Sequence, residues 1–592
     1  MRASAFVAVL ALAFAIATGT GTALARPAQG VETAADASAV RIAADRLASL
    51  SIPRAAASAG EARKLWVFFT DKALSEADER AAIDQAAASL SPRALARRAK
   101  VGMQVNRNDL PVAEEYVSAV SATGAEIVVR TRWLNAVSVR ATAAQAAAIA
   151  RLPFVREVRP VARATKELPV ITPADSRPGG GGGRSLNYGE SYGQLDQIQV
   201  TDLHEEGYDG TGILIAMFDT GFDTSHQAFA SLDLVAERDF INNDAETADE
   251  PGDPEGQDSH GTATLSCVGG AYPGQLYGGS YNASFALAKT EMIDDEIQIE
   301  EDHWVAAAEW ADSLGADVIS SSLGYFDWYT YEDMDGNTAV TTIAADMAAA
   351  RGIVVVNSMG NEGDSYWVYM IAPADGDSVV SVGAVDLDGV RRYWSSIGPT
   401  YDGRTKPDVM ALGSYVYVAS TGAPDEYGYS SGTSFSCPLT AGAVGLLLEG
   451  HSEWAPSDVI EAIHTTATQS GSPDNYMGWG ILQAADAMHS APLGVDETGA
   501  GGPALVAASP NPFAPQTAVR YVVREDGRVR VTVHDASGRL VRTVFDGVRR
   551  AGSYASDWDG TDGNGENVAS GVYFVRLAWD GGEAVSKMAL LR

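Results

Sequence analysis

The central part of this chain alternates short apolar segments with helical ones. Runs such as Ile213–Phe218 and Ile353–Val356 have the length and composition of buried strands. Because parallel strands need crossover helices, the alternation predicts a parallel sheet covered by helices on both faces. Polar side chains that follow these strands should then meet at the carboxyl edge of the sheet. The alternating segments are residues 213–218, 259–268, 285–288, 303–314, 318–321, 344–351, 353–356 and 379–385.

Three polar motifs stand at the ends of such segments. Asp219 ends an apolar run and enters a Thr-Gly turn, and His260, followed by Gly-Thr, opens a helix. Ser434 follows Gly-Thr at a turn that leads into the apolar helix Leu439–Glu449. A serine hydroxyl needs a base to take its proton, and an imidazole base needs a carboxylate to fix its tautomer. We therefore predict Ser434 as nucleophile, His260 as general base and Asp219 as the group that orients His260.

A fourth motif supplies hydrogen-bond donors for a developing oxyanion. Asn361 follows the apolar run Val354–Val356 in a turn flanked by Gly360 and Gly363. Its side-chain amide is the first predicted donor. The backbone N–H of Ser434 is the second, since free amides and the helix dipole at a helix start both favour an anion. Removing one such donor typically costs about 3 to 4 kcal/mol of transition-state stabilisation.

These four motifs, in the order Asp, His, Asn, Ser, are similar to the active-site motifs of the subtilisin-like serine proteases, the subtilases. The resemblance covers roughly residues 187–489. It implies an α/β, subtilisin-like doubly wound parallel sheet with flanking helices, and a serine endopeptidase acting on protein or peptide substrates. It also implies that backbone groups of Ser322, Leu323 and Gly324, together with Gly360, bind an extended substrate.

Acidic residues dominate the region that carries these motifs. Residues 186–490 hold 7 Lys and Arg against 49 Asp and Glu, whereas residues 26–185 hold 23 against 16. Such an acidic body excludes nucleic-acid binding, and complementary charge favours docking of the basic segment on it. The dense run Glu291–Asp302 is predicted either to favour basic substrate side chains or to form a solvated face.

The basic segment resembles a subtilase propeptide, a small α+β domain that acts as intramolecular chaperone and inhibitor. Expected strands are 65–69, 126–130, 136–139 and 155–158; expected helices are 76–90 and 143–152, with an inserted helical piece near 91–115. Self-cleavage is expected between Val161 and Leu186. The glycine run Gly179–Gly183 within that interval is suited to be a flexible linker.

Residues 1–25 have the features of a signal peptide: Arg2, an apolar run and Ala23-Leu-Ala25 as the cleavage site. No other apolar stretch reaches the about 20 residues that a membrane span needs. The protein is thus expected to be secreted, extracellular or attached to the cell surface. The predicted organisation is a signal peptide 1–25, a propeptide 26–178, a linker 179–186, a catalytic domain 187–490, a linker 491–503 and a β-sandwich 504–592.

The C-terminal segment alternates apolar and polar residues at strand period, which predicts about seven short strands in a β-sandwich. It resembles the immunoglobulin-like domain of flagellar hook-capping proteins and the sorting domains of type IX secretion substrates. We predict sorting or anchoring through secretion or cell-surface machinery, with a passive stability module as the alternative. Trp558 is predicted to be a core residue.

Metal and disulfide signals are weak. The eight histidines are scattered without zinc spacing, so no metal site and no required cofactor are predicted, although structural calcium remains open. The two cysteines, Cys267 and Cys437, lie near His260 and Ser434. Export would allow a disulfide between them, but two buried thiols are the favoured interpretation.

The predicted function is a secreted serine endopeptidase that hydrolyses peptide bonds through an acyl-enzyme on Ser434. The alternative, from another class, is a surface-binding or adhesive protein that carries an inert subtilase body.

Overall fold

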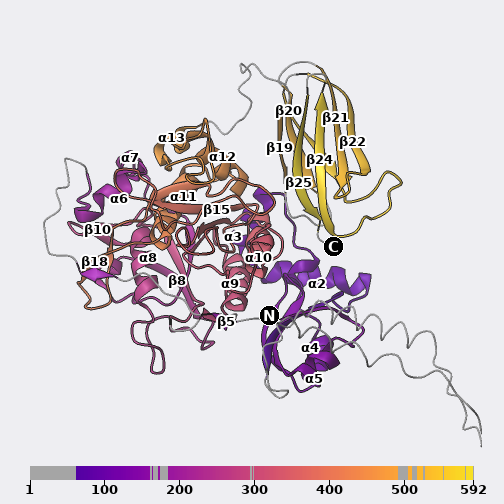
Figure 1. The fold of residues 1–592 in the computed structure, drawn as a ribbon, viewed down its shortest axis with the longest axis horizontal. Helices are drawn as coiled ribbons and strands as arrows, with labels where there is room; N and C mark the ends of the chain where they lie inside the picture. Colours follow the sequence, from indigo (N-terminus) through magenta and orange to yellow (C-terminus); the bar gives the residue numbers. More distant parts are fainter. Residues whose placement is uncertain are drawn as a thin grey trace, which may run out of the picture.

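The structure is a computed structural model that describes residues 62–160, 163–164, 171–173, 185–293, 296–297, 299–490, 504–509, 517–523, 527–550, 552–579 and 582–590. The predicted signal peptide 1–25, the glycine run Gly179–Gly183 and the linker 491–503 lie outside these residues. No helix in the described part is both long enough and apolar enough to cross a membrane. Figure 1 shows an N-terminal α/β domain, a central body and a C-terminal β domain.

The central body is built on a seven-stranded sheet in which neighbouring strands run parallel, in the order β16-β15-β14-β13-β7-β11-β8. The predicted parallel sheet is thereby confirmed. Its strands are β7 (Leu214–Asp219), β8 (Asp233–Asp239), β11 (Ser284–Lys289), β13 (Val318–Ser321), β14 (Val354–Ser358), β15 (Val379–Val385) and β16 (Val409–Leu412).

Alternate residues of each strand face opposite layers of helices. Ile215 and Met217 of β7 pack in one apolar cluster with helices α8 and α11, whereas Ala216 and Phe218 pack in another with α9 and α10. Both faces are therefore dry over the central strands, which is why β7, β13, β14 and β15 are buried at every position. The helices are α6 (Tyr192–Asp196), α7 (Val200–Glu206), α8 (Ser259–Gly269), α9 (Ile299–Leu314), α10 (Val340–Ala350), α11 (Thr433–Gly450), α12 (Pro456–Thr466) and α13 (Ala484–His489).

Several elements of the body were not part of the predicted pattern, among them both edge strands of the sheet, β16 and β8. The edge strand β8 (Asp233–Asp239) was not predicted, because an edge strand is solvated along one side and this one alternates exposed and half-buried residues. Helix α11 begins at Thr433 rather than Leu439 and includes Pro438. Ser434 therefore lies in the first turn of a helix that is buried along most of its length.

The N-terminal domain has an antiparallel sheet in the order β2-β3-β1-β4 with its own apolar core. All the predicted strands and helices occur, and the inserted helical piece consists of α3 and the start of α4. The elements are β1 (Arg63–Phe69), α2 (Glu76–Ser89), α3 (Pro92–Lys100), α4 (Glu114–Ser121), β2 (Glu126–Thr131), β3 (Ala136–Ala141), α5 (Ala143–Ile149) and β4 (Val155–Pro160).

Opposite charges join the N-terminal domain to the body at helix α9, beside which α3 lies in Figure 1. Lys64 pairs with Asp302, and both Arg97 and Arg98 pair with Asp312. The carboxylates of Asp302 and Asp312 are fully buried in this contact. The charge division along the chain therefore corresponds to a physical interface.

In the described part of the C-terminal domain, seven strands form two antiparallel sheets, β19-β20-β23 and β22-β21-β24-β25. Residues of both sheets share one core, which includes Trp558, so the predicted sandwich and the core position of Trp558 are confirmed. The strands are β19 (Ala504–Ser509), β20 (Thr517–Val523), β21 (Gly527–Asp535), β22 (Leu540–Arg549), β23 (Gly552–Trp558), β24 (Gly571–Trp579) and β25 (Gly582–Leu590).

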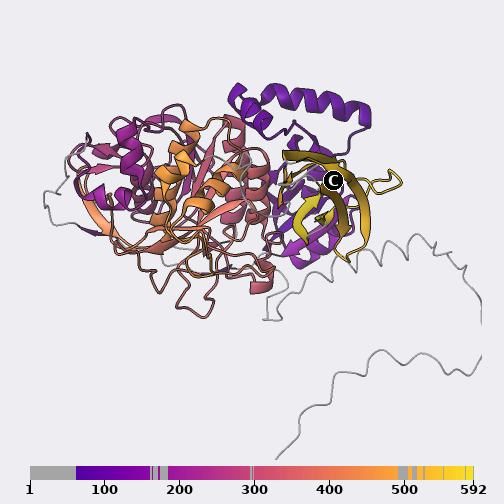
Figure 2. The ribbon, with the colours of Figure 1, turned by 90° about the horizontal axis from the view of Figure 1, so that it is seen from above.

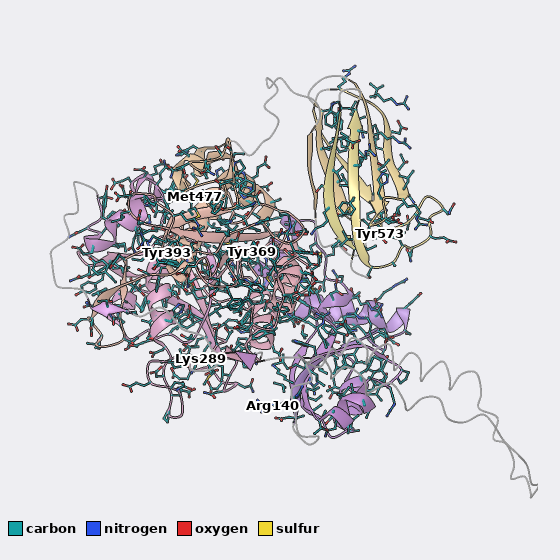
Figure 3. All side chains as sticks on the ribbon, in the orientation of Figure 1. Arg140, Lys289, Tyr369, Tyr393, Met477 and Tyr573 are labelled. Atoms are coloured by element: carbon teal, nitrogen blue, oxygen red, sulfur yellow. The ribbon has the colours of Figure 1, made fainter. Side chains whose placement is uncertain are left out.

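The N-terminal and C-terminal domains lie at the same end of the central body in both ribbon views (Figures 1 and 2). Each of the three parts has its own packed interior, as the side chains in Figure 3 illustrate. The sandwich contacts the body through Lys587, whose Nζ lies 2.7 Å from Asp402 and 3.2 Å from Asp377.

Candidate active site

Asp219 and His260 are brought together at the carboxyl edge of the central sheet. Asp219 is the last residue of β7, and His260 lies in the first turn of α8. The Nδ1 atom of His260 is 2.6 Å from Oδ1 of Asp219, and both side chains are buried. A hydrogen bond at Nδ1 leaves Nε2 as the atom of the ring that can exchange a proton with another group.

The surroundings of Asp219 favour its ionised form. Burial opposes ionisation, but the nearby His260 and hydrogen bonds from Thr220 and Thr264 outweigh it and hold the pKa of Asp219 below its usual range. The backbone N–H of Thr220 donates to Oδ1 over 2.8 Å, and the hydroxyl of Thr264 donates to Oδ2 over 2.8 Å. Asp219 is thus an oriented carboxylate that accepts a hydrogen bond from the imidazole.

Ser434 lies beside this pair, on the neighbouring helix. Helices α8 and α11 pack against each other, and the ring of His260 is 5.9 Å from that of Phe435, the residue after Ser434. The Oγ of Ser434 points to the carbonyl oxygen of Ser322 at 3.4 Å. Nε2 of His260 is buried and has no hydrogen-bond partner among the described residues. The structure therefore places the three predicted catalytic residues together, without a hydrogen bond between Ser434 and His260.

Asn361 is fixed by the residue that precedes Ser434. The backbone N–H and the hydroxyl of Thr433 donate to Oδ1 of Asn361 over 2.9 and 3.1 Å. Because the amide oxygen accepts these bonds, the Nδ2 end of the side chain is left to donate elsewhere. Gly360 N in turn donates to the Thr433 hydroxyl over 3.2 Å. The loop of Asn361 and the start of α11 are thereby locked to each other.

The predicted substrate-binding residues follow two adjacent strands. Ser322, Leu323 and Gly324 extend β13, and Gly360 lies just past β14. Ser322 is tied to Ser434 in both directions, since its hydroxyl also donates to the Ser434 carbonyl over 2.7 Å. The carbonyl of Leu323 accepts from Nδ2 of Asn357 over 3.0 Å. This bond holds Leu323 to the neighbouring strand, and the Ser322 carbonyl is the backbone group of the segment that reaches Ser434 Oγ.

Two pairs of short strands were not found by sequence reasoning. Strand β12 (Glu296–Ile297) pairs antiparallel with β5 (Arg163–Ala164), and β18 (Tyr427–Ser430) pairs antiparallel with β6 (Thr172–Pro173). The chain thus adds strands of its own to the edges of this region, the mode by which extended peptides bind proteins. Strands β5, β6 and β12 have two residues each and thus no periodicity, so no local signal could have revealed them.

The interpretation of Glu291–Asp302 as a substrate-facing or solvated face is wrong for four of its carboxylates. These four are buried: Glu291, Glu300, Glu301 and Asp302. Asp302 pairs with Lys64, and Glu301 accepts hydrogen bonds from Trp328 Nε1 and the Tyr329 hydroxyl. Burial raises the pKa of Glu301 to about 8 despite these donors. The carboxylates hold the start of α9 and the N-terminal domain in place.

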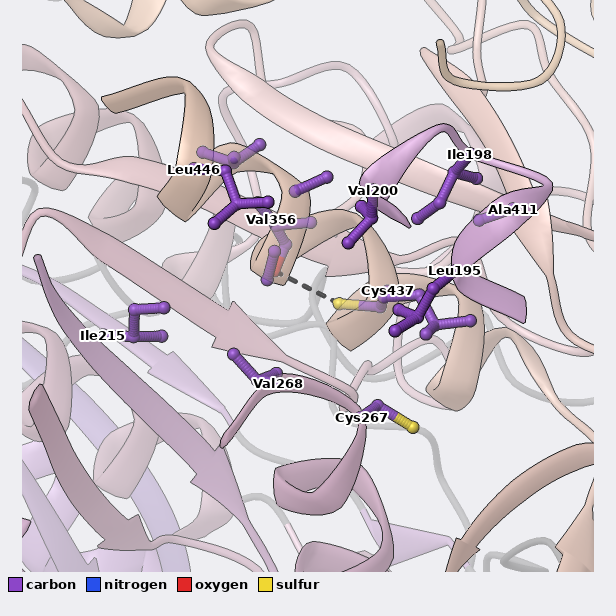
Figure 4. Packing of buried hydrophobic residues seen from close by; sticks show 14 of the residues in the cluster. Leu195, Ile198, Val200, Ile215, Cys267, Val268, Val356, Ala411, Cys437 and Leu446 are labelled. Atoms are coloured by element: carbon purple, nitrogen blue, oxygen red, sulfur yellow. Dashed lines mark hydrogen bonds between the residues drawn. The ribbon is translucent and has the colours of Figure 1, made fainter. Parts of the chain in front are cut away.

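Cys267 and Cys437 are free, buried thiols, as favoured from the sequence. Figure 4 shows both in the apolar cluster between α8 and α11, with Cys437 bonded to the backbone of Val356. The Sγ atom of Cys437 is 3.4 Å from that carbonyl oxygen. Burial raises the pKa of Cys437 to about 12. These residues act as small apolar side chains.

One cluster of three carboxylates among the described residues has the spacing to hold a cation. Oxygen atoms of Asp239, Asp244 and Glu250 lie within 4.8 Å of one another. Lys289, labelled in Figure 3, already sets its ammonium 3.0 Å from Asp239 and 2.6 Å from Asp253. Lys289 therefore already supplies a positive charge to one of these three carboxylates, Asp239.

Sequence comparison finds three regions that match known families. Residues 210–480 match the subtilase family, residues 64–173 a Peptidase S8 propeptide domain of Bacteroidota, and residues 516–583 the FlgD Ig-like domain. The basic N-terminal domain is therefore a subtilase propeptide domain, and the C-terminal sandwich is FlgD-like.

Individual relatives agree. The chain is 31% identical over 300 residues to subtilisin of Bacillus pumilus, which is 50% of this chain and 97% of that protein. It is also 31% identical over 300 residues to subtilisin J of Geobacillus stearothermophilus, covering 70% of that protein. Fervidolysin of Fervidobacterium pennivorans, a keratinolytic enzyme related to subtilisin, shares the fold: its TM-score is 0.52 at 20% identity, over 88% of this chain and 72% of that one. Since these matches cover the segments that carry Asp219 and His260, the chain belongs to the subtilase family of serine proteases.

Proposed function

We propose that the protein is a secreted serine endopeptidase that cleaves peptide bonds through an acyl-enzyme on Ser434. The observation that carries this proposal is the 2.6 Å contact between Asp219 and His260, next to the helix whose first turn carries Ser434. The contact directs an unpartnered Nε2 atom of a buried imidazole away from Asp219. A proton acceptor in that position serves a neighbouring hydroxyl nucleophile.

In the first step, Ser434 Oγ attacks the carbonyl carbon of the peptide bond while Nε2 of His260 takes its proton. Asp219 holds Nδ1–H and stabilises the imidazolium that forms. Nδ2 of Asn361 and the Ser434 N–H donate to the oxyanion, and the start of α11 adds the favourable end of a helix dipole. His260 then gives its proton to the leaving amine. In the second half, water attacks the acyl group with His260 again as base.

The presence of the propeptide domain supports the proposal that the protein first folds as an inhibited precursor. The propeptide chain pairs with β12 and β18 of the body in the way that an extended peptide would, so we expect it to block access of other peptides until it is cut. The expected cut lies between Val161 and Leu186. Secretion is supported by the signal-like residues 1–25, and we propose that the FlgD-like sandwich sorts or anchors the protein at the cell surface.

None of the steps of this mechanism uses a metal ion, so we propose that the protease requires no cofactor. EDTA should then leave kcat unchanged. Structural calcium would appear instead as a chelator-dependent fall in melting temperature.

The decisive variant is Ser434→Ala, which should abolish peptidase activity and self-cleavage of the propeptide. A fluorophosphonate probe should label the wild type and fail to label this variant. Ser436→Ala is the matched control, because Ser436 lies in the same turn and donates only to the Thr433 carbonyl. Undiminished turnover by purified Ser434→Ala would reject the assignment. Absence of labelling in the wild type after propeptide removal would favour the alternative, an adhesive protein with an inert body.

A further inference from the structure

The geometry points to Ile371 as the residue that determines which substrate side chain is accepted before the cleaved bond. The accepted side chains are small ones, such as that of alanine. This inference rests on the proposed function and concerns the same site. Sequence reasoning placed Gly324 and Gly360 at the substrate but identified nothing between them.

Gly324 and Gly360 occupy equivalent positions on two neighbouring parallel strands. In the pairing of β13 with β14, Ser321 lies opposite Asn357, and each glycine lies three residues further along its own segment. Both segments leave the sheet at the edge where Ser434 lies, and Ser322 O is 3.4 Å from Ser434 Oγ. A peptide that is cut at Ser434 therefore presents its side chain to the slot between the two glycine backbones.

The side chain of Ile371 fills this slot. A Cβ atom added to Gly324 would come within 2.5 Å of both Cδ1 and Cγ1 of Ile371. A Cβ atom added to Gly360 would meet the same two atoms at 2.9 and 3.0 Å. One isoleucine side chain thus touches both walls, so the slot is closed at the depth where a large substrate side chain would extend.

Ile371 is held rigidly in that position. Its N–H donates to the Met359 carbonyl over 3.3 Å, and the next residue, Ala372, exchanges two hydrogen bonds of 2.8 and 3.0 Å with Tyr325. Only 8% of Ile371 is exposed. Since the backbone on both sides is fixed, a large substrate side chain cannot displace Ile371 without breaking this packing. A methyl group needs no such displacement.

The test compares kcat/KM for peptide substrates that differ only in alanine or phenylalanine before the cleaved bond. The wild type should favour alanine. Shortening the side chain in Ile371→Val, Ile371→Ala and Ile371→Gly should raise the ratio of phenylalanine to alanine stepwise, by about 100-fold for glycine. Met370→Ala is the matched control, because Met370 is adjacent and also buried but is not among the nearest neighbours of either glycine. Its ratio should stay at the wild-type value.

Three results would overturn the inference: a wild type that favours phenylalanine, an unchanged ratio in active Ile371 variants, or an equal change in Met370→Ala. The graded series keeps the test valid if the glycine variant does not fold. Failure of the proposed function is a separate result, since it would appear as no fluorophosphonate labelling of Ser434 and no cleavage of any peptide. N-terminal sequencing of the mature protein adds an independent readout: a self-cleavage after Leu168 or Ile171 would contradict the inference.

Discussion

The backbone N–H of Thr433 donates to the side-chain oxygen of Asn361 over 2.9 Å, although the two residues are 72 positions apart. This bond decides which end of the Asn361 amide is left to donate. It also connects the turn after β14 to the first residue of the helix that carries Ser434, so the two proposed oxyanion donors are positioned by one contact.

Asn361→Ala should lower kcat by about 10²- to 10³-fold with little change in KM, because the lost bond strengthens only as the oxyanion forms. Steady-state kinetics on a peptide substrate measures both constants. Glu362→Gln changes the next residue and should leave kcat near the wild-type value. A rise in KM at constant kcat would instead mean that Asn361 binds the ground state.

Asp219→Asn should lower kcat by about 10⁴-fold while leaving the fold intact, since an amide no longer fixes the imidazole tautomer that a carboxylate selects. Thr264→Val, which removes one of the bonds to Asp219, should cause a much smaller loss. Kinetics at several pH values gives the comparison. Similar losses in both variants would show that hydrogen bonding around Asp219, not its charge, is the important factor.

Asp312→Asn should loosen the propeptide. Asp312 is buried between Arg97 and Arg98 of α3, and removing one partner of a buried ion pair costs about 3 to 5 kcal/mol because the other charge stays uncompensated. The cleaved propeptide should then dissociate sooner, which shortens the lag before peptidase activity and reduces co-elution in gel filtration. Glu114→Gln is the control, because its pair with Arg130 is exposed and contributes little.

Loss of the proton from Asp258 should make the protein less stable as pH rises from about 4 to about 6. Burial, with the charge of Asp249 nearby, raises the pKa of Asp258 to about 6. The folded state therefore holds a proton that the unfolded chain releases from about pH 4 upwards, so the free energy of unfolding falls across this window. Urea denaturation of the Ser434→Ala protein at several pH values measures the slope. In the double variant with Asp258→Asn the slope should flatten.

The thiols of Cys267 and Cys437 should not react with a disulfide reagent in the native protein. Both are buried, and burial raises the pKa of each above its usual range, so almost no thiolate forms at neutral pH. Two thiols per chain should appear when the Ser434→Ala protein is denatured. Rapid reaction of either cysteine before unfolding would contradict the described packing.

Most of the fold could be predicted from local sequence patterns. The strands around Ile215 and Val355 could be predicted because both faces of the sheet are dry, which requires continuous apolar runs. The candidate catalytic and oxyanion residues could be predicted because each follows a strand or begins a helix of this sheet. They are Asp219, His260, Asn361 and Ser434. The edge strand Asp233–Asp239 could not be predicted, because only its last residue is buried and it therefore has no apolar run.

What the sequence determined by itself is the order of elements and the chemical types that gather at one edge of the sheet. Tertiary structure alone decided that Glu301 and Asp302 are buried beneath the propeptide, that Thr433 orients Asn361, and that Ile371 lies between Gly324 and Gly360. The physical reason is distance along the chain. Secondary structure follows from neighbouring residues, whereas burial, ion pairing and the closing of a pocket depend on which remote segments come into contact.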